Sequence, residues 1–257
     1  RLADYEAAIS DDTALLLRVH TSNFKIVGFT EQASLAELVE LGNRNFIPVM
    51  DDIGSGALID LSPFSFPDEP SAPASIREGA DLVCASGDKL LGGCQAGLIL
   101  GREELVSELR HSPLYRALRV DKLALIVLET TLRLYLDPAT LLEANPTLRM
   151  IAEPLEACAR RAARMARAIR RTCPPADVVV GGSHAQIGSG SLPGERLPTK
   201  VVAVRLPDLT ADELARRLRL AEPAVFSRIR DDRVLLDAKT VLPGEATAIG
   251  EAFRHLT

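Results

Sequence analysis

Short apolar runs, each closed by glycine or by polar side chains, constrain the fold of this chain more than any other feature of its sequence. Each run has the length of a buried strand rather than that of a helix. Strands of this kind that alternate with helical segments predict an α/β architecture with a mainly parallel sheet. The four runs occupy residues 13–20, 46–53, 82–86 and 96–100.

A helical pattern and a loop pattern lie between these runs. Four apolar residues share one face of the helix expected after the first run, and Thr30 is expected to cap it. Residues 62–75 are rich in proline and serine, which predicts a surface loop. The four apolar positions of the helix are Leu35, Leu38, Val39 and Leu41.

The pattern changes after Asp121, where helical periodicity takes over. Residues 121–136 and 146–172 are expected to form two helices, which end at prolines. The remaining segments predict strands at 177–180 and 199–206, a helix from a capping box at Thr210 to Leu220, a hairpin over 225–241 that turns at Asp231-Asp232, and a final helix over 246–256. We therefore expect two domains, residues 1–145 and 146–257, of which the second is α+β with an antiparallel sheet.

Charge and cysteine usage exclude several classes of protein. A formal net charge of −5 over 257 residues argues against a protein that coats nucleic acid by global charge. The four cysteines form no C-x-x-C pair, so no metal site is expected. The apolar runs are too short to span a membrane, and a reducing cytoplasm is the expected compartment. Because Arg1 is not a start methionine, we also expect that an upstream segment is missing.

A lysine between a buried strand and a glycine-rich turn is the strongest chemical feature of the sequence. Residues 86–93 read SGDKLLGG, with Lys89 in the middle. Two interpretations stay open from the spacing alone. Lys89 is either an ordinary loop lysine or the residue that forms a Schiff base with an aldehyde cofactor. In the second case, the glycines allow the backbone to approach the cofactor.

Asp52 supplies a second, independent indication at the end of another apolar run. Ligands of open α/β sheets bind at the carboxyl ends of the strands. Asp52 lies at the end of one predicted strand and Lys89 follows another, so both are expected at this edge. A buried carboxylate is the group that keeps the ring nitrogen of pyridoxal phosphate (PLP) protonated. The alternative is a turn aspartate before Gly54, and the two features together favour a PLP site.

Five stretches along the chain resemble the bacterial L-seryl-tRNA(Sec) selenium transferase family, in the same order as in that family. The similarity covers nearly the whole chain, and the string around Lys89 is much more specific than a generic PLP lysine. One departure is Cys94, which stands where the family has proline. The stretches are residues 21–30 (TSNFKIVGFT), 86–93 (SGDKLLGG), 114–122 (LYRALRVDK), 190–194 (GSLPG) and 217–223 (RLRLAEP).

The resemblance implies an aspartate-aminotransferase-like fold, known as fold type I, with part of the large domain followed by a C-terminal α+β small domain. It implies PLP as the cofactor, with Lys89 as the Schiff-base lysine and Asp52 beside the pyridine nitrogen. Ser86 is expected near the cofactor phosphate and Asn23 near the ring oxygen. Asp88 matches a carboxylate that assists catalysis, and a simple turn role for it stays open.

The resemblance also implies a reaction and its partners. Seryl-tRNA(Sec) would be converted to selenocysteinyl-tRNA(Sec) through an aminoacrylyl intermediate, with selenophosphate as the selenium donor. Arg116 and Arg119, spaced to share a helical face, would bind this anion. A large homo-oligomer is implied as well. Since the upstream half is expected to be absent, we expect the chain alone to be weakly active or inactive.

Three rival functions and two further features stay open at this point. The rivals are a related PLP enzyme that acts on a free amino acid, a non-catalytic oligomerisation module, and a plain tRNA-binding protein. His20 ends a strand, where a satisfied core histidine is favoured over a residue near the cofactor. One helical face carries four arginines, which either face solvent or meet tRNA phosphates. These are Arg160, Arg164, Arg167 and Arg171.

Overall fold

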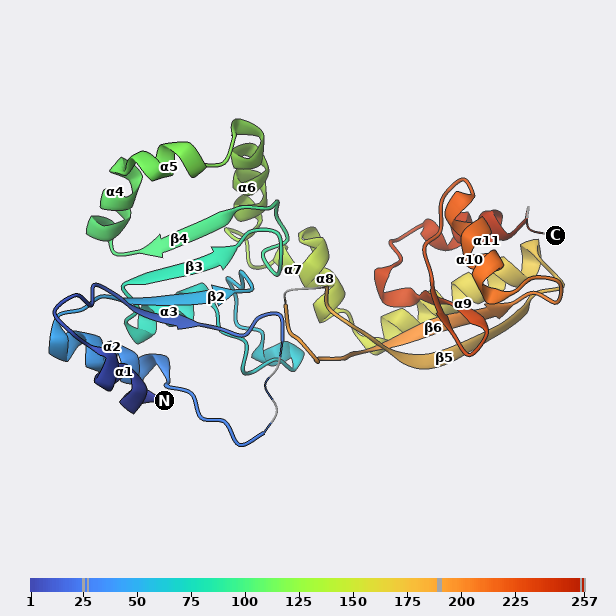
Figure 1. Ribbon diagram of the computed structural model, residues 1–257. Coiled ribbons are helices and arrows are strands. Elements are labelled where there is room, and N and C mark those ends of the chain that lie inside the picture. Colours follow the sequence, from blue (N-terminus) through green and yellow to red (C-terminus); the bar gives the residue numbers. More distant parts are fainter. Residues whose placement is uncertain (25, 27, 189–190, 255, 257) are drawn as a thin grey trace. The chain divides into compact units, whose positions relative to one another are not determined.

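The chain forms two compact units, each with its own four-stranded sheet and its own hydrophobic core (Figure 1). The computed structural model describes residues 1–24, 26, 28–188, 191–254 and 256. The first unit comprises residues 1–149 and 187–195, and the second comprises residues 150–186 and 196–257. No helix among the described residues is long and apolar enough to cross a membrane.

The sheet of the first unit is mostly parallel, as the apolar runs predict. Strands β1 (Leu16–Val19), β2 (Val49–Gly54) and β3 (Leu82–Ser86) run parallel in the order β1-β2-β3. Strand β4 (Gly97–Gly101) joins the edge antiparallel to β3. Only a short turn links β3 to β4, which suits an antiparallel pair, because a parallel pair needs a long crossover.

Helices α1 (Leu2–Ala8), α2 (Leu35–Asn45) and α3 (Ala72–Glu78) belong to this unit, and α2 and α3 pack on one face of its sheet (Figure 1). Leu35, Leu38 and Leu41 are buried, as expected. The predicted cap at Thr30 is wrong, because α2 begins after Ser34. The Ser34 hydroxyl accepts from the Glu37 backbone N–H, and the Glu37 carboxylate accepts from the Ser34 N–H. Thr30 has an alanine three residues later and cannot form this reciprocal pair.

The expected loop over residues 62–75 is only partly a loop. A 3₁₀ turn spans Ser62–Phe64, and α3 begins at Ala72 inside the same segment. Pro73 does not prevent this helix, because the backbone N–H of a first-turn residue has no helical partner to lose. The proline-rich composition therefore concealed a helix start.

Five helices follow β4 and lead to the second unit: α4 (Glu103–His111), α5 (Pro113–Leu118), α6 (Lys122–Leu134), α7 (Leu141–Ala144) and α8 (Pro146–Ala152). The predicted start of α6 is confirmed, since the Asp121 carboxylate caps it. The single helix expected over 146–172 is wrong. It is divided between α8 and α9 (Leu155–Thr172), because Pro154 excludes the helical conformation from the residue before it.

The second unit is α+β with an antiparallel sheet, as expected. Its strands β5 (Asp177–Ala185), β6 (Leu197–Arg205), β7 (Arg228–Arg230) and β8 (Arg233–Asp237) have the order β5-β6-β8-β7. Asp231 and Asp232 form the predicted hairpin turn, with φ of 50° and 53°. A 3₁₀ turn (Ala238–Thr240) and helices α10 (Ala211–Leu220) and α11 (Glu245–Arg254) complete the unit. His255, in the predicted final helix, lies outside the described residues.

Helix α9 is the centre of this second core. It packs on β5, β6 and α11 (Figure 1). Its apolar face is buried, while the four arginines of its other face are exposed. The solvated interpretation of that arginine face is therefore compatible with the fold. Ile169 on the apolar face is fully buried.

We expect Ile169→Val to destabilise the second unit by about 0.5–1.5 kcal/mol, because it removes one buried methylene and leaves a small void. The free energy of unfolding from urea titration measures the effect. The exposed Arg167→Lys change on the same helix serves as the control and should leave the midpoint unchanged within error.

Candidate functional site

Two glycine-containing segments, residues 54–56 after β2 and residues 86–93 after β3, are joined at the carboxyl end of the parallel strands. The backbone N–H of Leu90 donates to the Ser55 carbonyl oxygen at 2.9 Å. Gly56 has a φ of +77°, and a Cβ added there would lie 2.1 Å from the Ser86 carbonyl oxygen. Only glycine fits this position, so the segment after β2 lies directly against the end of β3.

Lys89 and Asp52 belong to one corner of this edge. The half-buried Lys89 ammonium lies 3.5 Å from the hydroxyl oxygen of Ser22, which is itself buried. A Cβ added at Gly54 would lie 2.7 Å from that hydroxyl oxygen and 3.9 Å from Oδ1 of Asp52. Ser22 therefore contacts the lysine and lies close to the strand end that carries Asp52, a position that the sequence analysis did not assign to it.

The Asp52 carboxylate is hydrogen-bonded to the backbone at the end of its own strand, β2. Its Oδ1 accepts from the Gly54 backbone N–H at 3.0 Å. Cys84 is its register partner on β3. Burial, and secondly the negative charge of Asp52, raise the pKa of the Cys84 thiol to about 11. The thiol is therefore protonated and unreactive at neutral pH.

We expect Asp52→Asn to lower the pKa of Cys84 and so speed its alkylation by iodoacetamide at pH 9, because the thiolate loses a repelling charge. Mass spectrometry of the Cys84 peptide gives the rate. Cys94 alkylation in the same samples is the internal control. An unchanged Cys84 rate would contradict a charged Asp52 at this position.

The turn that carries Lys89 is anchored from distant parts of the unit. Tyr135 Oη and Asn145 Nδ2 each donate to the Leu91 carbonyl oxygen at 2.9 Å. Asn145 is fully buried, and burial raises the pKa of Tyr135 to about 12. The sequence analysis missed both residues, because contacts across 44 and 54 residues leave no local pattern.

The other predicted cofactor residues lie around this corner with different exposure. Ser86 is half-buried at the end of β3, whereas Asp88 and Asn23 are exposed. Cys94 fits the turn, where its Sγ donates to the Ala124 carbonyl oxygen at 3.5 Å. Of the motif residues quoted above, Lys25, Val27 and Gly190 lie outside the described residues.

Arg116 and Arg119 are both exposed, but they do not share one helix. Arg116 belongs to α5, which ends at Leu118, and Arg119 is its extended C-cap residue with ψ of 144°. The prediction that both lie on one helical face is therefore wrong. The short helix ends because Arg119 leaves the helical region before Asp121 caps α6.

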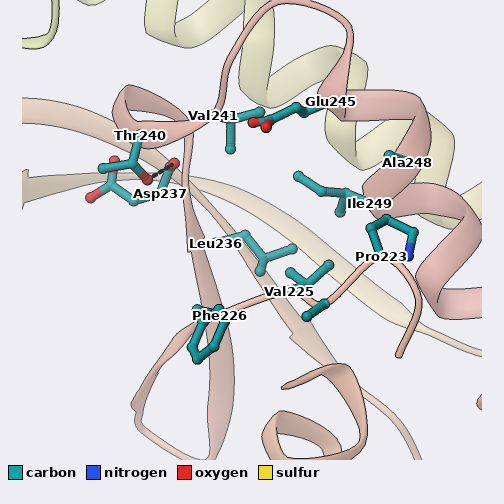
Figure 2. Close-up of a pocket in the computed structure, with 11 residues that line it drawn as sticks. Pro223, Val225, Phe226, Leu236, Asp237, Thr240, Val241, Glu245, Ala248 and Ile249 are labelled. Carbon is teal, nitrogen blue, oxygen red and sulfur yellow. Dashed lines mark hydrogen bonds between the residues drawn. The ribbon is translucent and has the colours of Figure 1, made fainter. Parts of the chain in front are cut away.

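The second unit contains a separate cavity that lacks comparable chemistry (Figure 2). It is lined mainly by apolar side chains, among them Val225, Leu236 and Ile249. Its carboxylate Asp237 is already engaged, since it accepts from the Thr199 hydroxyl at 2.6 Å and from the Arg228 guanidinium at 2.8 Å. Across the described part of the chain, no group of three or more His, Cys, Asp or Glu residues could hold a metal ion.

Comparisons with known proteins agree on a single family. The family model "SelA: L-seryl-tRNA selenium transferase" matches residues 1–242. The L-seryl-tRNA(Sec) selenium transferase of Alkaliphilus metalliredigens (strain QYMF) is 45% identical over 253 residues, covering 98% of this chain and 54% of that protein. That of Clostridium botulinum (strain 657 / Type Ba4) is 42% identical over 255 residues, covering 99% and 55%. The chain spans about half the length of these curated relatives.

A solved structure supports the fold. D-glucosaminate-6-phosphate ammonia-lyase has a TM-score of 0.57 at 20% sequence identity, and the match covers 100% of this chain and 60% of that one. This likeness, together with the mixed sheet, confirms the expected fold type I architecture.

Proposed function

Because the chain belongs to the L-seryl-tRNA selenium transferase family, we propose that it carries the lysine half of an active site that converts seryl-tRNA(Sec) to selenocysteinyl-tRNA(Sec) in the cytoplasm. The single observation that carries the proposal is the corner formed by Lys89, Ser22 and Asp52 at the strand ends. A lysine and a carboxylate at this edge are the two groups that a PLP enzyme of this fold requires.

The residues of the corner fit PLP. The half-buried Lys89 amine makes a single long contact among the described residues, at 3.5 Å from the Ser22 hydroxyl oxygen, which leaves it available to an aldehyde. Gly54 and Gly56, with φ of +62° and +77°, let the segment after β2 pack closely against Ser22 and the end of β3, which brings these strand ends together. The Ser55 hydroxyl is fully buried and has no hydrogen-bond partner among the described residues, so a polar group remains to be satisfied here.

Each residue of the corner has a distinct proposed role. When bound, PLP supplies an electron sink that stabilises negative charge at the α-carbon of the seryl group. Lys89 would hold the cofactor and, with its amine free, would accept the α-proton. Asp52 would keep the proton on the ring nitrogen, and Ser86 and Asn23 would hold the phosphate and the ring oxygen. Asp88, exposed beside the lysine, assists proton transfer.

The selenium donor and the assembly are part of the same proposal. Arg116 and Arg119 bind selenophosphate, because guanidinium groups pair with phosphate-like oxygens. Both are exposed and therefore accessible to a diffusing anion. The protein acts as a homo-oligomer, and several large apolar side chains exposed on α5 and α6 are compatible with subunit contacts. They include Leu114, Leu118, Leu123 and Ile126.

A chimera tests this function directly. The chain is fused to the remaining half of the Alkaliphilus metalliredigens relative and incubated with PLP, seryl-tRNA(Sec) and selenophosphate. We expect selenocysteinyl-tRNA(Sec) from the chimera and little or none from the chain alone. Turnover of free serine without tRNA would instead favour the amino-acid lyase. No turnover of either substrate, together with self-association of the chain in light scattering, would favour an oligomerisation module.

A further inference from the structure

A small cavity of the first unit opens beside the corner and contains an unsatisfied buried carboxylate. Its volume is about 200 Å³, and its lining includes His20, Thr21, Phe24, Phe66 and Glu69. Sites for whole drug-sized ligands measure about 300–1,000 Å³, so this cavity suits one group of a larger substrate.

Glu69 is the residue that indicates a ligand. Its side chain is only 3% exposed, and its Oε2 lies 3.6 Å from Nε2 of His20. The other oxygen, Oε1, has no hydrogen-bond partner among the described residues. A buried acceptor without a donor is costly, so the cavity lacks a group that donates a hydrogen bond.

The position of the cavity connects it to the Lys89 corner. His20 is tied to β2, since its backbone N–H donates to the Asp52 carbonyl oxygen at 2.8 Å. Thr21, in the cavity wall, directly precedes Ser22, whose hydroxyl contacts Lys89. A substrate whose reacting group is at Lys89 therefore has the atoms next to that group near this cavity.

We propose that the cavity receives the terminal nucleoside of the acylated tRNA, with Glu69 accepting a hydrogen bond from a ribose hydroxyl or from the base amine. This assignment rests on the proposed function, in which the seryl group reacts at Lys89. That group is esterified to the terminal ribose, which must lie beside the reacting atoms. Phe24, about half-exposed, and Pro193 supply flat walls for a base.

The charge of the lining decides against other ligands. Among the described residues that line the cavity, Asp68, Glu69 and Glu195 are acidic and His20 alone is basic, so a phosphate or selenophosphate is repelled. The nucleoside itself is uncharged and carries hydroxyl and amine donors. A small cation would suit the carboxylates but would not use the aromatic wall, and the experiment separates these two cases.

Binding of adenosine to this chain tests the assignment without requiring turnover. We expect saturable binding in isothermal titration, weakened at least about fivefold by Glu69→Gln, because an acceptor charge is lost. Phe24→Ala should weaken binding as well. Because Phe24 is exposed, this variant tests the cavity without the risk of misfolding that the buried Glu69→Gln change carries. Glu108→Gln on the exposed surface of α4 is the matched control and should bind as the parent chain does.

Each outcome bears on the proposal. The proposal would be overturned if the parent chain showed no saturable binding of adenosine. It would also be overturned if Glu69→Gln and Phe24→Ala both bound adenosine with the affinity of the parent chain. Displacement of adenosine by ethylammonium at similar concentration would mean a cation site and overturn it as well. Trapping of PLP on Lys89 is measured separately in this chain and in the chimera. Adenosine binding without trapping in either protein would refute the proposed function, whereas trapping without adenosine binding would refute only the cavity assignment.

Discussion

Borohydride reduction of this chain in the presence of PLP is expected to leave a phosphopyridoxyl group on Lys89, and the Lys89→Ala variant is expected to carry none at the site. The reason is geometric and chemical. Lys89 is half-buried beside Ser22 and Asp52, and an amine in such a site reacts with an aldehyde more readily than a fully hydrated one. Peptide mapping by mass spectrometry locates the adduct.

The same change should remove the activity of the chimera. Loss of a group that both holds the cofactor and moves the α-proton is expected to lower selenocysteinyl-tRNA(Sec) formation by at least about 10²–10⁴-fold. Lys122→Ala, at an exposed lysine that begins α6, is the control and should change neither labelling nor rate. An adduct in the chimera alone would mean that the rest of the relative's sequence is needed to hold PLP. Absence of the adduct in both proteins would refute the proposed function.

Local periodicity predicted the strands of this fold well because it depends on neighbours in the sequence. β1, β2, β3 and β4 all lie inside the predicted apolar runs or within a residue of them, because strands favour apolar and β-branched side chains. Their burial was predicted less well, since β1 buries only Leu16 and β4 buries none of its residues. The turn at Asp231-Asp232 was predictable for the same local reason. Helix boundaries were harder to predict than strands. The cap of α2 is Ser34 because Glu37 completes its capping box, and the break at Pro154 divides a helical pattern that is periodic on both sides.

The site was predictable in its chemical groups but not in its supporting contacts. Lys89 and Asp52 were identified from strand ends and from the family resemblance, and they lie in one corner. Ser22 contacts Lys89, and Tyr135 and Asn145 anchor the turn that carries it at the Leu91 carbonyl oxygen, through contacts between segments distant in sequence that no local pattern encodes.

The second large effect is expected in the other unit, where Arg161→Leu should destabilise the fold by about 3 kcal/mol. Arg161 pairs with both oxygens of Glu153, one of them at 2.8 Å, and also donates to the Ala238 carbonyl oxygen. The two side chains are only 13% and 12% exposed. Removing one partner of a buried pair leaves an uncompensated charge, which costs about 3–5 kcal/mol. Because water still reaches both side chains, we expect a loss near the lower end of this range. Urea unfolding measures the difference.

The control and the pH dependence make this prediction specific. Arg160→Leu, one residue earlier and exposed, should change stability by no more than about 0.5 kcal/mol. Replacing both partners, as Glu153→Met with Arg161→Met, should recover most of the loss.

Burial opposes ionisation of Glu153, but the hydrogen bonds and charge of Arg161, with Cys158 and Lys239, hold the pKa of Glu153 below its ordinary value of 4.5. A carboxyl group with a lowered pKa in the folded state stabilises the fold above pH 4.5, and this contribution fades as the pH falls through the lowered value. The deficit of Arg161→Leu relative to the parent chain should therefore be full at pH 7 and shrink as the pH falls through the lowered pKa of Glu153. A deficit that stays constant over this range would mean that lost packing of the arginine stem, rather than the ion pair, causes it.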